Sequence, residues 1–187
     1  MSGRQSAWSW SVAQAELVGV LPHRWAHSRG VAQAAARLGI AVGGDRELLV
    51  AAAILHDVGY APRLAHTGFH PLDGARFLRD EHQADERLVR LVANHTFALL
   101  EAEERGLRDE LEAEFPLLDN QVLVDALTYA DMATTPKGEP TTPADRIAEI
   151  VGRYGPDTIV GRFIQRAEPE ILATADRIER LLAVQPR

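Results

Sequence analysis

The sequence predicts an all-α protein, and three observations support this fold class. Apolar residues recur at helical spacing along nearly the whole chain of 187 residues. No run that alternates apolar and polar residues between turn signals indicates a strand. Proline and glycine stand where helices are expected to begin and end. Because one domain spans about 100–200 residues, we expect a single helical bundle over residues 1–187.

Each helix is placed by the residues at its two ends. Pro22 lies in the first turn of a helix that is expected to run to Leu38 and to end at Gly39. Asp45 is the expected N-cap of a second helix, which runs to about Val58. The later helices are expected at 71–81, 85–95, 97–114, 121–132, 143–155 and 157–184.

The Pro- and Thr-rich segment 134–146 is the one break in this pattern. It closes with Thr142-Pro143-Ala144-Asp145, which has the form of a capping box with proline at the first helical position. About forty residues beyond it are few for an independent core. We therefore expect the helices of 143–185 to pack onto the first part of the chain, and Pro169 is a point where the last helix can be interrupted.

Composition excludes several classes of function. The 27 acidic and 20 basic residues give a net charge of -7 without a basic stripe, so a polymeric nucleic acid is not an expected partner. The absence of cysteine excludes disulfides, thiolate ligands and a cysteine nucleophile. The longest apolar run, LLVAAAIL, is shorter than the roughly 18–20 residues that span a bilayer, so no membrane partner is expected. Without a signal-peptide pattern, the cytoplasm is the expected location.

The stretch AAAILHDVGYAP at 51–62 places two polar residues at the end of an apolar helical run. These are His56 and Asp57. Burying a carboxylate without a partner costs several kcal/mol or more, so such a group shifts its pKa, finds a hydrogen-bonded partner or binds a metal. Adjacent residues on a regular helix point about 100° apart, so the helix must open near Gly59 if both are to serve one centre. We favour the metal.

Three further polar residues lie on the apolar faces of other helices. His27 precedes Val31 by four residues, and His95 and Asp131 each follow apolar residues by four and seven. A lone inward histidine is typically a satisfied core residue, but inward histidines and aspartates on four helices together favour one metal site. Imidazole and carboxylate ligands suit Fe, Mn, Ni or Zn better than Mg or Ca. Iron or manganese is the expected metal.

The order His27, then His56-Asp57, then Asp131 resembles the metal-binding signature of the HD-domain superfamily, an all-helical fold of metal-dependent phosphohydrolases. The resemblance covers about residues 20–135. It implies that these four residues hold a first metal. Two further histidines, His70 in GFHPLDGARFL and His95 in ANHT, match the places where two-metal members add ligands. The resemblance therefore implies two ions per chain, with Asp57 as the bridging ligand.

Within that superfamily, the His95-Thr96 pair and the following YAD resemble the hydrolases of symmetrical diadenosine tetraphosphate. The cyclic-di-GMP phosphodiesterases of the HD-GYP branch usually carry a lysine after HD, a GYP segment and a His-His pair, and this chain has Tyr60 and Asn94-His95 instead. The Glu-Asp pair of the alarmone hydrolases is also absent. These two substrate classes are therefore disfavoured.

The expected activity is hydrolysis of a small phosphorylated substrate, a nucleotide such as a dinucleoside polyphosphate, by metal-activated water. His56 and Asp57 are the expected catalytic residues. Candidates for binding the substrate phosphates, each of which also suits a solvated surface position, are Arg24, Arg63, His66, Asn94 and Lys137.

Two other functions fit the same residues. HD-fold mixed-valent diiron oxygenases use the same six ligands, and a non-catalytic module would bind a nucleotide or metal without turnover. The sequence sets neither the substrate nor the oligomeric state.

Overall fold

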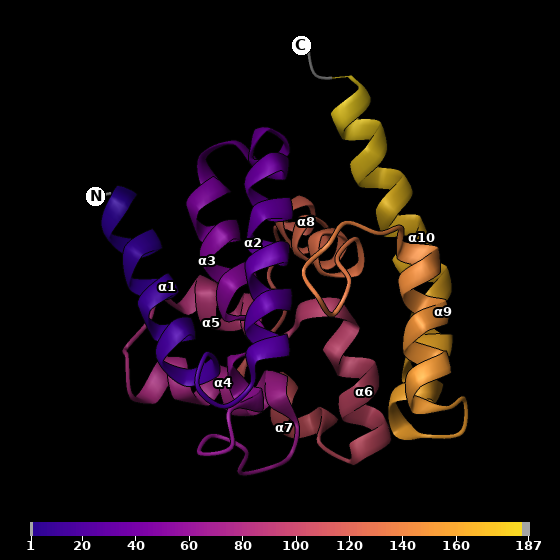
Figure 1. Ribbon diagram of the computed structural model, residues 1–187, viewed down its shortest axis with the longest axis horizontal. Coiled ribbons are helices and arrows are strands. Elements are labelled where there is room, and N and C mark those ends of the chain that lie inside the picture. Colours follow the sequence, from indigo (N-terminus) through magenta and orange to yellow (C-terminus); the bar gives the residue numbers. More distant parts are fainter. Residues whose placement is uncertain (1, 185–187) are drawn as a thin grey trace.

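The computed structural model describes residues 2–184, which form helices joined by loops and contain no strand (Figure 1). The all-α prediction is confirmed. The helices are α1 (Ser2–Leu17), α2 (Pro22–Val42), α3 (Arg46–Leu55), α4 (His70–Asp80), α5 (Glu86–Ala93), α6 (Ala98–Arg105), α7 (Arg108–Glu114), α8 (Gln121–Met132), α9 (Pro143–Tyr154) and α10 (Ile159–Ala183). Short 3-10 turns are η1 (Gly43–Asp45), η2 (Val58–Tyr60) and η3 (His95–Phe97).

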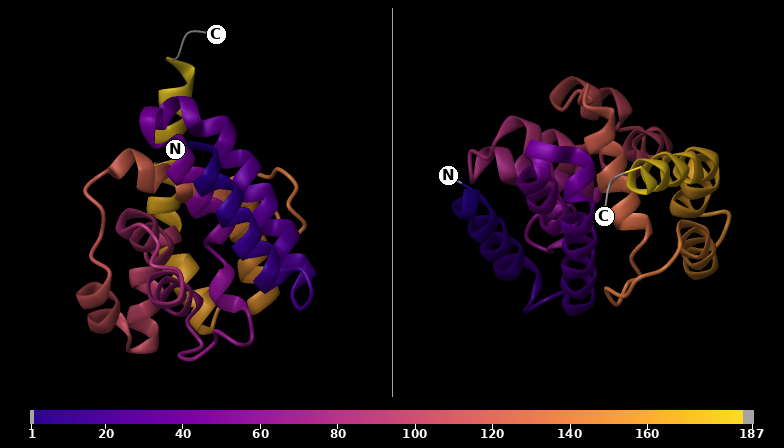
Figure 2. Two further views of the ribbon diagram at one scale, coloured as in Figure 1. Left: turned by 90° about the vertical axis from the view of Figure 1, so that its left-hand side faces the viewer. Right: turned by 90° about the horizontal axis from the view of Figure 1, so that it is seen from above.

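The helices are arranged around the packed pair α2 and α3 (Figure 1). Helix α1 lies against α3, and α8 packs against α2. Helices α9 and α10 lie side by side on the opposite side of the molecule from α1, as the further views also show (Figure 2). Helix α10 contacts α2, α6 and α8, so the last two helices pack onto the rest of the described chain.

Buried apolar side chains form two clusters. The larger lies among α1 to α8 and the second half of α10, and includes Leu49, Leu72 and Leu127, each almost fully buried. The smaller joins the end of α8 to α9 and α10 through residues such as Met132 and Phe163. Burial of apolar surface at about 25 cal/mol per Å² is the main force that holds such helices together. The boundary between the two clusters is where the candidate site lies.

Three helix ends differ from the sequence predictions. Helix α2 continues past Gly39. A Cβ at Gly39 would lie 2.4 Å from the side chain of Arg46, so the glycine serves close packing and does not end the helix. Helix α2 ends before Gly43, whose φ is 57°. Helix α3 ends at Leu55, three residues before the predicted end. The stretch predicted as one helix at 97–114 is two helices, because Gly106 adopts φ 72° after α6.

Side-chain caps begin some of the helices but not all of them. Thr142 accepts a hydrogen bond from the backbone N–H of Asp145, as the predicted capping box requires. Asp85 likewise caps α5. Asp45 stands at the predicted N-cap of α3 but makes no capping hydrogen bond, because its carboxylate is held by Arg87. Pro169 lies inside α10 without ending it.

No helix within residues 2–184 is both long enough and apolar enough to cross a membrane.

Candidate metal centre

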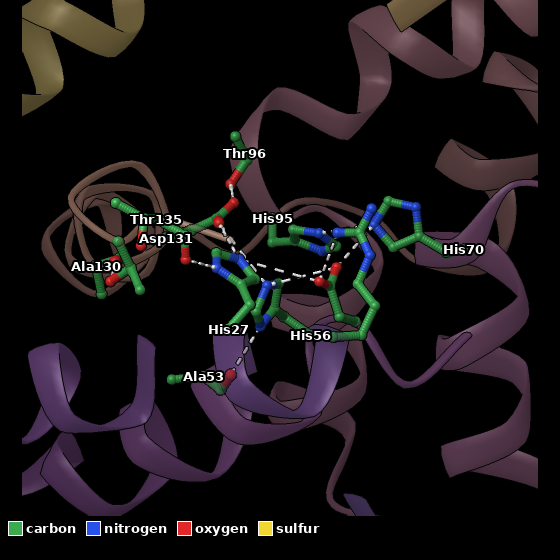
Figure 3. A network of polar contacts seen from close by, with 12 residues as sticks. His27, Ala53, His56, His70, His95, Thr96, Ala130, Asp131 and Thr135 are labelled. Atoms are coloured by element: carbon green, nitrogen blue, oxygen red, sulfur yellow. Dashed lines mark hydrogen bonds and ion pairs between the residues drawn. The ribbon is translucent and has the colours of Figure 1, made fainter. Parts of the chain in front are cut away.

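Side chains from five parts of the fold meet in one cluster (Figure 3). They come from α2, the turn after α3, the start of α4, η3 and the end of α8. The six residues are His27, His56, Asp57, His70, His95 and Asp131. Their nitrogen and oxygen atoms form three overlapping groups, each with its atoms within 4.8 Å of one another: His27, His56 and Asp57; His56, His95 and Asp131; and Asp57, His70 and His95. The structure thus places all six predicted ligands together.

The end of α3 explains how His56 and Asp57 both point into the cluster. The helix stops at Leu55, and Asp57 has φ -96° and ψ 6°, outside the regular helical geometry. Because the regular helix ends here, the two neighbouring side chains are not held about 100° apart, as they would be within a helix. Nε2 of His56 therefore lies 3.5 Å from Oδ1 of Asp57, and both side chains are buried.

Hydrogen bonds to the backbone fix one nitrogen in three of the imidazoles. The Nδ1 atoms of His27, His56 and His95 lie 3.0, 2.7 and 2.7 Å from backbone carbonyl oxygens. A carbonyl oxygen only accepts, so each Nδ1 carries a proton and donates it. The Nε2 atoms are left to face the cluster, which is the orientation that backbone partners give to metal-binding histidines.

One inward nitrogen of the cluster is an acceptor without a donor. Nε2 of His56 is buried, has no hydrogen-bond partner among the described residues, and lies 3.8 Å from Oδ1 of Asp131. The Nε2 atoms of His70 and His95 lie 3.2 Å apart. Burial lowers the pKa of both of these histidines, so neither imidazole readily takes up a second proton. The nitrogen and oxygen atoms that face one another in the cluster have few protons to share, and this set of imidazole and carboxylate ligand atoms fits a metal ion.

Both carboxylates of the cluster stay ionised despite burial. Burial by itself raises the pKa of Asp57, but the fields of His56 and Arg24 outweigh it and hold that pKa well below its ordinary value. Burial also raises the pKa of Asp131, but the imidazoles of His27 and His56 beside it outweigh burial and hold that pKa below its ordinary value. The cluster therefore offers two buried negative charges to a cation.

His70 reaches the cluster because two backbone segments approach closely. A Cβ on Gly59 would lie 2.0 Å from the carbonyl oxygen of His70 and 2.5 Å from the backbone nitrogen of Gly74. Because Gly59 carries only hydrogen at this position, η2 packs against the start of α4. The imidazole of His70 then stacks on Tyr60, with ring centroids 3.9 Å apart, and its Nε2 lies 3.4 Å from Oδ1 of Asp57.

A strained turn follows His95. Thr96 and Phe97 both adopt left-handed backbone angles, with φ 48° and 58°. This conformation is unusual for a β-branched residue and costs about 1–3 kcal/mol per residue. It directs the Thr96 hydroxyl to Oδ2 of Asp131, to which it donates at 2.5 Å (Figure 3). The other oxygen of Asp131 is left for the cluster, where it lies 3.0 Å from Nε2 of His27.

A cavity of about 80 Å³ adjoins the cluster. All the cluster residues except His56 line it. The opposite wall comes from α9 and α10 and is partly apolar, with Ile150, Phe163 and Ile164. A ligand in the cavity would touch both the histidines and the C-terminal helices.

Of the residues predicted to bind substrate, only Arg24 lines this cavity. Its guanidinium donates to Oδ2 of Asp57 at 2.9 Å and lies 3.9 Å from the centre of the Tyr60 ring. The other four predicted residues, Arg63, His66, Asn94 and Lys137, lie outside the lining of this cavity. Arg63 is held by Glu16 and Glu81, Asn94 donates to the carbonyl oxygens of Arg90 and Phe115, and His66 and Lys137 are exposed and lie outside the cavity lining.

Sequence reasoning missed the polar residues that α9 brings to the cavity. Arg146, Arg153 and Tyr154 line it, although they follow the predicted signature region. A signal was present: Arg146 precedes the buried Ile150 by four residues and so lies on the apolar face of its helix. The same helical spacing places the histidines on the apolar faces of their helices.

The HD domain family model matches residues 24–154. The chain belongs to the HD domain family. The match contains all six residues of the cluster and extends through α9, beyond the region in which the sequence resembled the superfamily. HD domains are generally metal-dependent hydrolases, and the cluster in this HD domain has the donor atoms to bind a divalent metal. No curated protein and no solved structure matched the chain.

Proposed function

We propose that this HD domain is a metal-dependent phosphohydrolase that acts on a small phosphoester. One observation carries the proposal: inward imidazole nitrogens and ionised carboxylates, without enough donors among them, adjoin a cavity that also holds arginine. The family match supports hydrolytic chemistry for such a cluster.

The proposed metal ligands divide into two sets. His27, His56 and Asp57, which form one of the three groups, would hold one ion together with Asp131, whose Oδ1 lies 3.0 Å from Nε2 of His27. This ion is iron or manganese in our proposal. His70 and His95 would hold a second, with Asp57 shared, in accord with the group that these three residues form. Two bound metal ions polarise a phosphoryl oxygen and lower the pKa of water near them, which supplies hydroxide at neutral pH.

The rest of the site orients the substrate. Arg24 lies at the cavity with a planar, always charged guanidinium, which suits two oxygens of one phosphoryl group. Its contacts with Asp57 and Tyr60 hold it in place. The apolar side chains of Phe163 and Ile164 exclude water from the opposite wall, and electrostatic contacts are stronger where water is excluded.

The cavity favours a compact substrate. Its volume of about 80 Å³ is well below the roughly 300–1,000 Å³ of pockets that enclose a drug-sized ligand. A phosphoryl group with a small organic part fits these dimensions. A dinucleoside polyphosphate would have to leave its nucleosides outside, so we place small phosphomonoesters ahead of it.

Metal content tests the ligand assignment before any substrate is known. Protein purified without chelators should contain about two iron or manganese ions per chain, and the double variant H70A/H95A should contain about one, because it keeps the first ligand set. Inductively coupled plasma mass spectrometry measures both. One ion in each protein would limit the proposal to a mononuclear site, and no metal even after reconstitution would refute it.

A screen of phosphoesters tests the reaction. The metal-loaded protein should release phosphate from small phosphomonoesters faster than from diadenosine tetraphosphate. Oxygen uptake, recorded with the same compounds, should stay at the background rate. Substrate-dependent oxygen consumption without phosphate release would show that the protein is an oxygenase and not a hydrolase.

The Thr96 hydroxyl should matter for metal affinity through Asp131. Thr96→Val keeps the branched shape but loses the donor, so we expect metal affinity to fall about 10- to 100-fold, as it does when a partner of a metal ligand is removed. Thr96→Ser keeps the donor and should bind metal as the wild type does. Competition with a metallochromic chelator measures the affinities. Equal affinity in the valine variant would show that Asp131 does not depend on this hydrogen bond.

A further inference from the structure

The side chain of Arg146 is a buried charge with an unused donor. The residue is 5% exposed, and its Nε–H has no acceptor within the described part of the chain. One of its terminal nitrogens contacts Glu149 on the same helix. A buried N–H without an acceptor is costly, and native structures rarely leave one without a reason. Arg146 lines the cavity beside the histidine and aspartate cluster, so a ligand in that cavity can supply the acceptor.

A second arginine shares the same face of α9. Arg153 follows Arg146 by seven residues and Ile150 lies between them, and all three line the cavity. Nε of Arg153 lies 3.1 Å from Glu149, the carboxylate that also contacts Arg146. Two guanidinium groups thus share one carboxylate, and Glu149 does not line the cavity. This wall presents an excess of positive charge to whatever occupies the cavity.

The other charges at the cavity do not cancel this excess. Glu101 lines the cavity, but Arg105 holds its carboxylate at 2.7 Å. Asp57 is already paired with Arg24, and Asp131 is held by the Thr96 hydroxyl and by His27. The guanidinium of Arg146 has no carboxylate partner other than the shared Glu149 among the ion pairs of the described residues.

We infer that Arg146, supported by Arg153, binds an anionic phosphoryl oxygen of the substrate from the α9 side of the cavity. The metal cluster and Arg24 would then contact the same group from the other side. The inference rests on the proposed function only in taking this cavity as the substrate site. It adds a substrate-binding wall from the C-terminal helices and requires a substrate whose anionic group spans the distance between α2 and α9.

Inorganic phosphate is a sufficient probe of this wall. Isothermal titration calorimetry should show that Arg146→Met weakens phosphate binding about 10- to 100-fold, the range expected for loss of a charge-assisted hydrogen bond. Arg146→Lys keeps the charge without the planar fork and should bind with intermediate affinity. Arg162→Met is the matched control, because Arg162 is paired with Glu104 and does not line the cavity. It should bind phosphate as the wild type does.

Folding of each variant is followed by urea denaturation in parallel. Methionine has no unsatisfied donor to bury, so Arg146→Met should be at least as stable as the wild type. If Arg146→Met does not fold, Arg153→Met provides the same test. The side chain of Arg153 is 38% exposed, so a smaller loss of phosphate affinity is expected. Wild-type affinity in both variants, no phosphate binding by the wild type, or an equal loss in Arg162→Met would overturn the inference.

The result is separable from the proposed hydrolysis. Phosphate binding weakened by Arg146→Met in a protein that hydrolyses no phosphoester would support the anion-binding wall and remove the proposed function. Phosphoester hydrolysis with an unchanged KM in Arg146→Met would support the proposed function and remove the anion-binding wall.

Discussion

Asp57→Asn should lower kcat/KM for phosphoester hydrolysis by about 10³-fold, equivalent to roughly 4 kcal/mol of transition-state stabilisation. The carboxylate lies within 3.5 Å of His56 and 3.4 Å of His70, so it is placed to join both proposed metal sites. Asparagine keeps the shape but removes the charge and one acceptor oxygen. It also leaves the guanidinium of Arg24 without its partner at 2.9 Å. Steady-state kinetics and metal content measure the loss.

Asp125→Asn is the control for this substitution. Asp125 is also buried and also pairs with an arginine, Arg177, but it lies outside the histidine and aspartate cluster. Its asparagine variant should lose stability while keeping kcat/KM and metal content. If Asp57→Asn retained full metal content and activity, the shared carboxylate would have no role and the binuclear proposal would fall.

The inward direction of the proposed ligands was predictable because it depends on local periodicity. His27, His56, His95 and Asp131 each follow or precede apolar residues at helical spacing, and all four are buried as that spacing predicts. Their convergence is a property of the tertiary fold. Its prediction rested on the joint occurrence of four such residues and on the resemblance to HD domains, since periodicity assigns a face to each helix without saying which faces meet.

The substrate-binding residues were less predictable because their partners lie far away in the chain. Arg63 closely follows His56-Asp57, yet Glu16, at a separation of 47 residues, draws its guanidinium away from the cavity. Proximity in sequence to a metal ligand says little about where a long, flexible side chain points. Arg146 shows the converse, because α9 brings it to a cavity whose histidines precede it by many residues.

Glycine was ambiguous for a related reason. The predicted end of α2 at Gly39 was wrong, and Gly43, with positive φ, ends the helix instead. Glycine serves both to adopt left-handed angles and to let another group approach closely. The sequence shows the residue but not which of the two uses applies. The left-handed Thr96 had no sequence signal at all, because its strain is maintained by surrounding contacts.

Gly59→Ala should cost about 2–4 kcal/mol of unfolding free energy, at or above the usual range for overpacking. Real Cβ atoms do not come within 3.0 Å of other heavy atoms, and this one would meet the backbone of His70 at 2.0 Å. The obstacle is backbone, so no side chain can rotate to relieve it. The start of α4 must therefore move away from η2, and His70 must move away from Asp57. Urea denaturation measures the cost.

Gly152→Ala separates this effect from the general consequence of adding a methyl group. Gly152 lies in α9, and a Cβ there would meet nothing within 4 Å. Its alanine variant should be as stable as the wild type or more stable by up to about 1 kcal/mol, since alanine favours the helix. Metal content should fall toward one ion per chain in Gly59→Ala and stay unchanged in Gly152→Ala. A Gly59→Ala protein with wild-type stability and two ions would mean that His70 reaches its place without the close approach of η2 and α4.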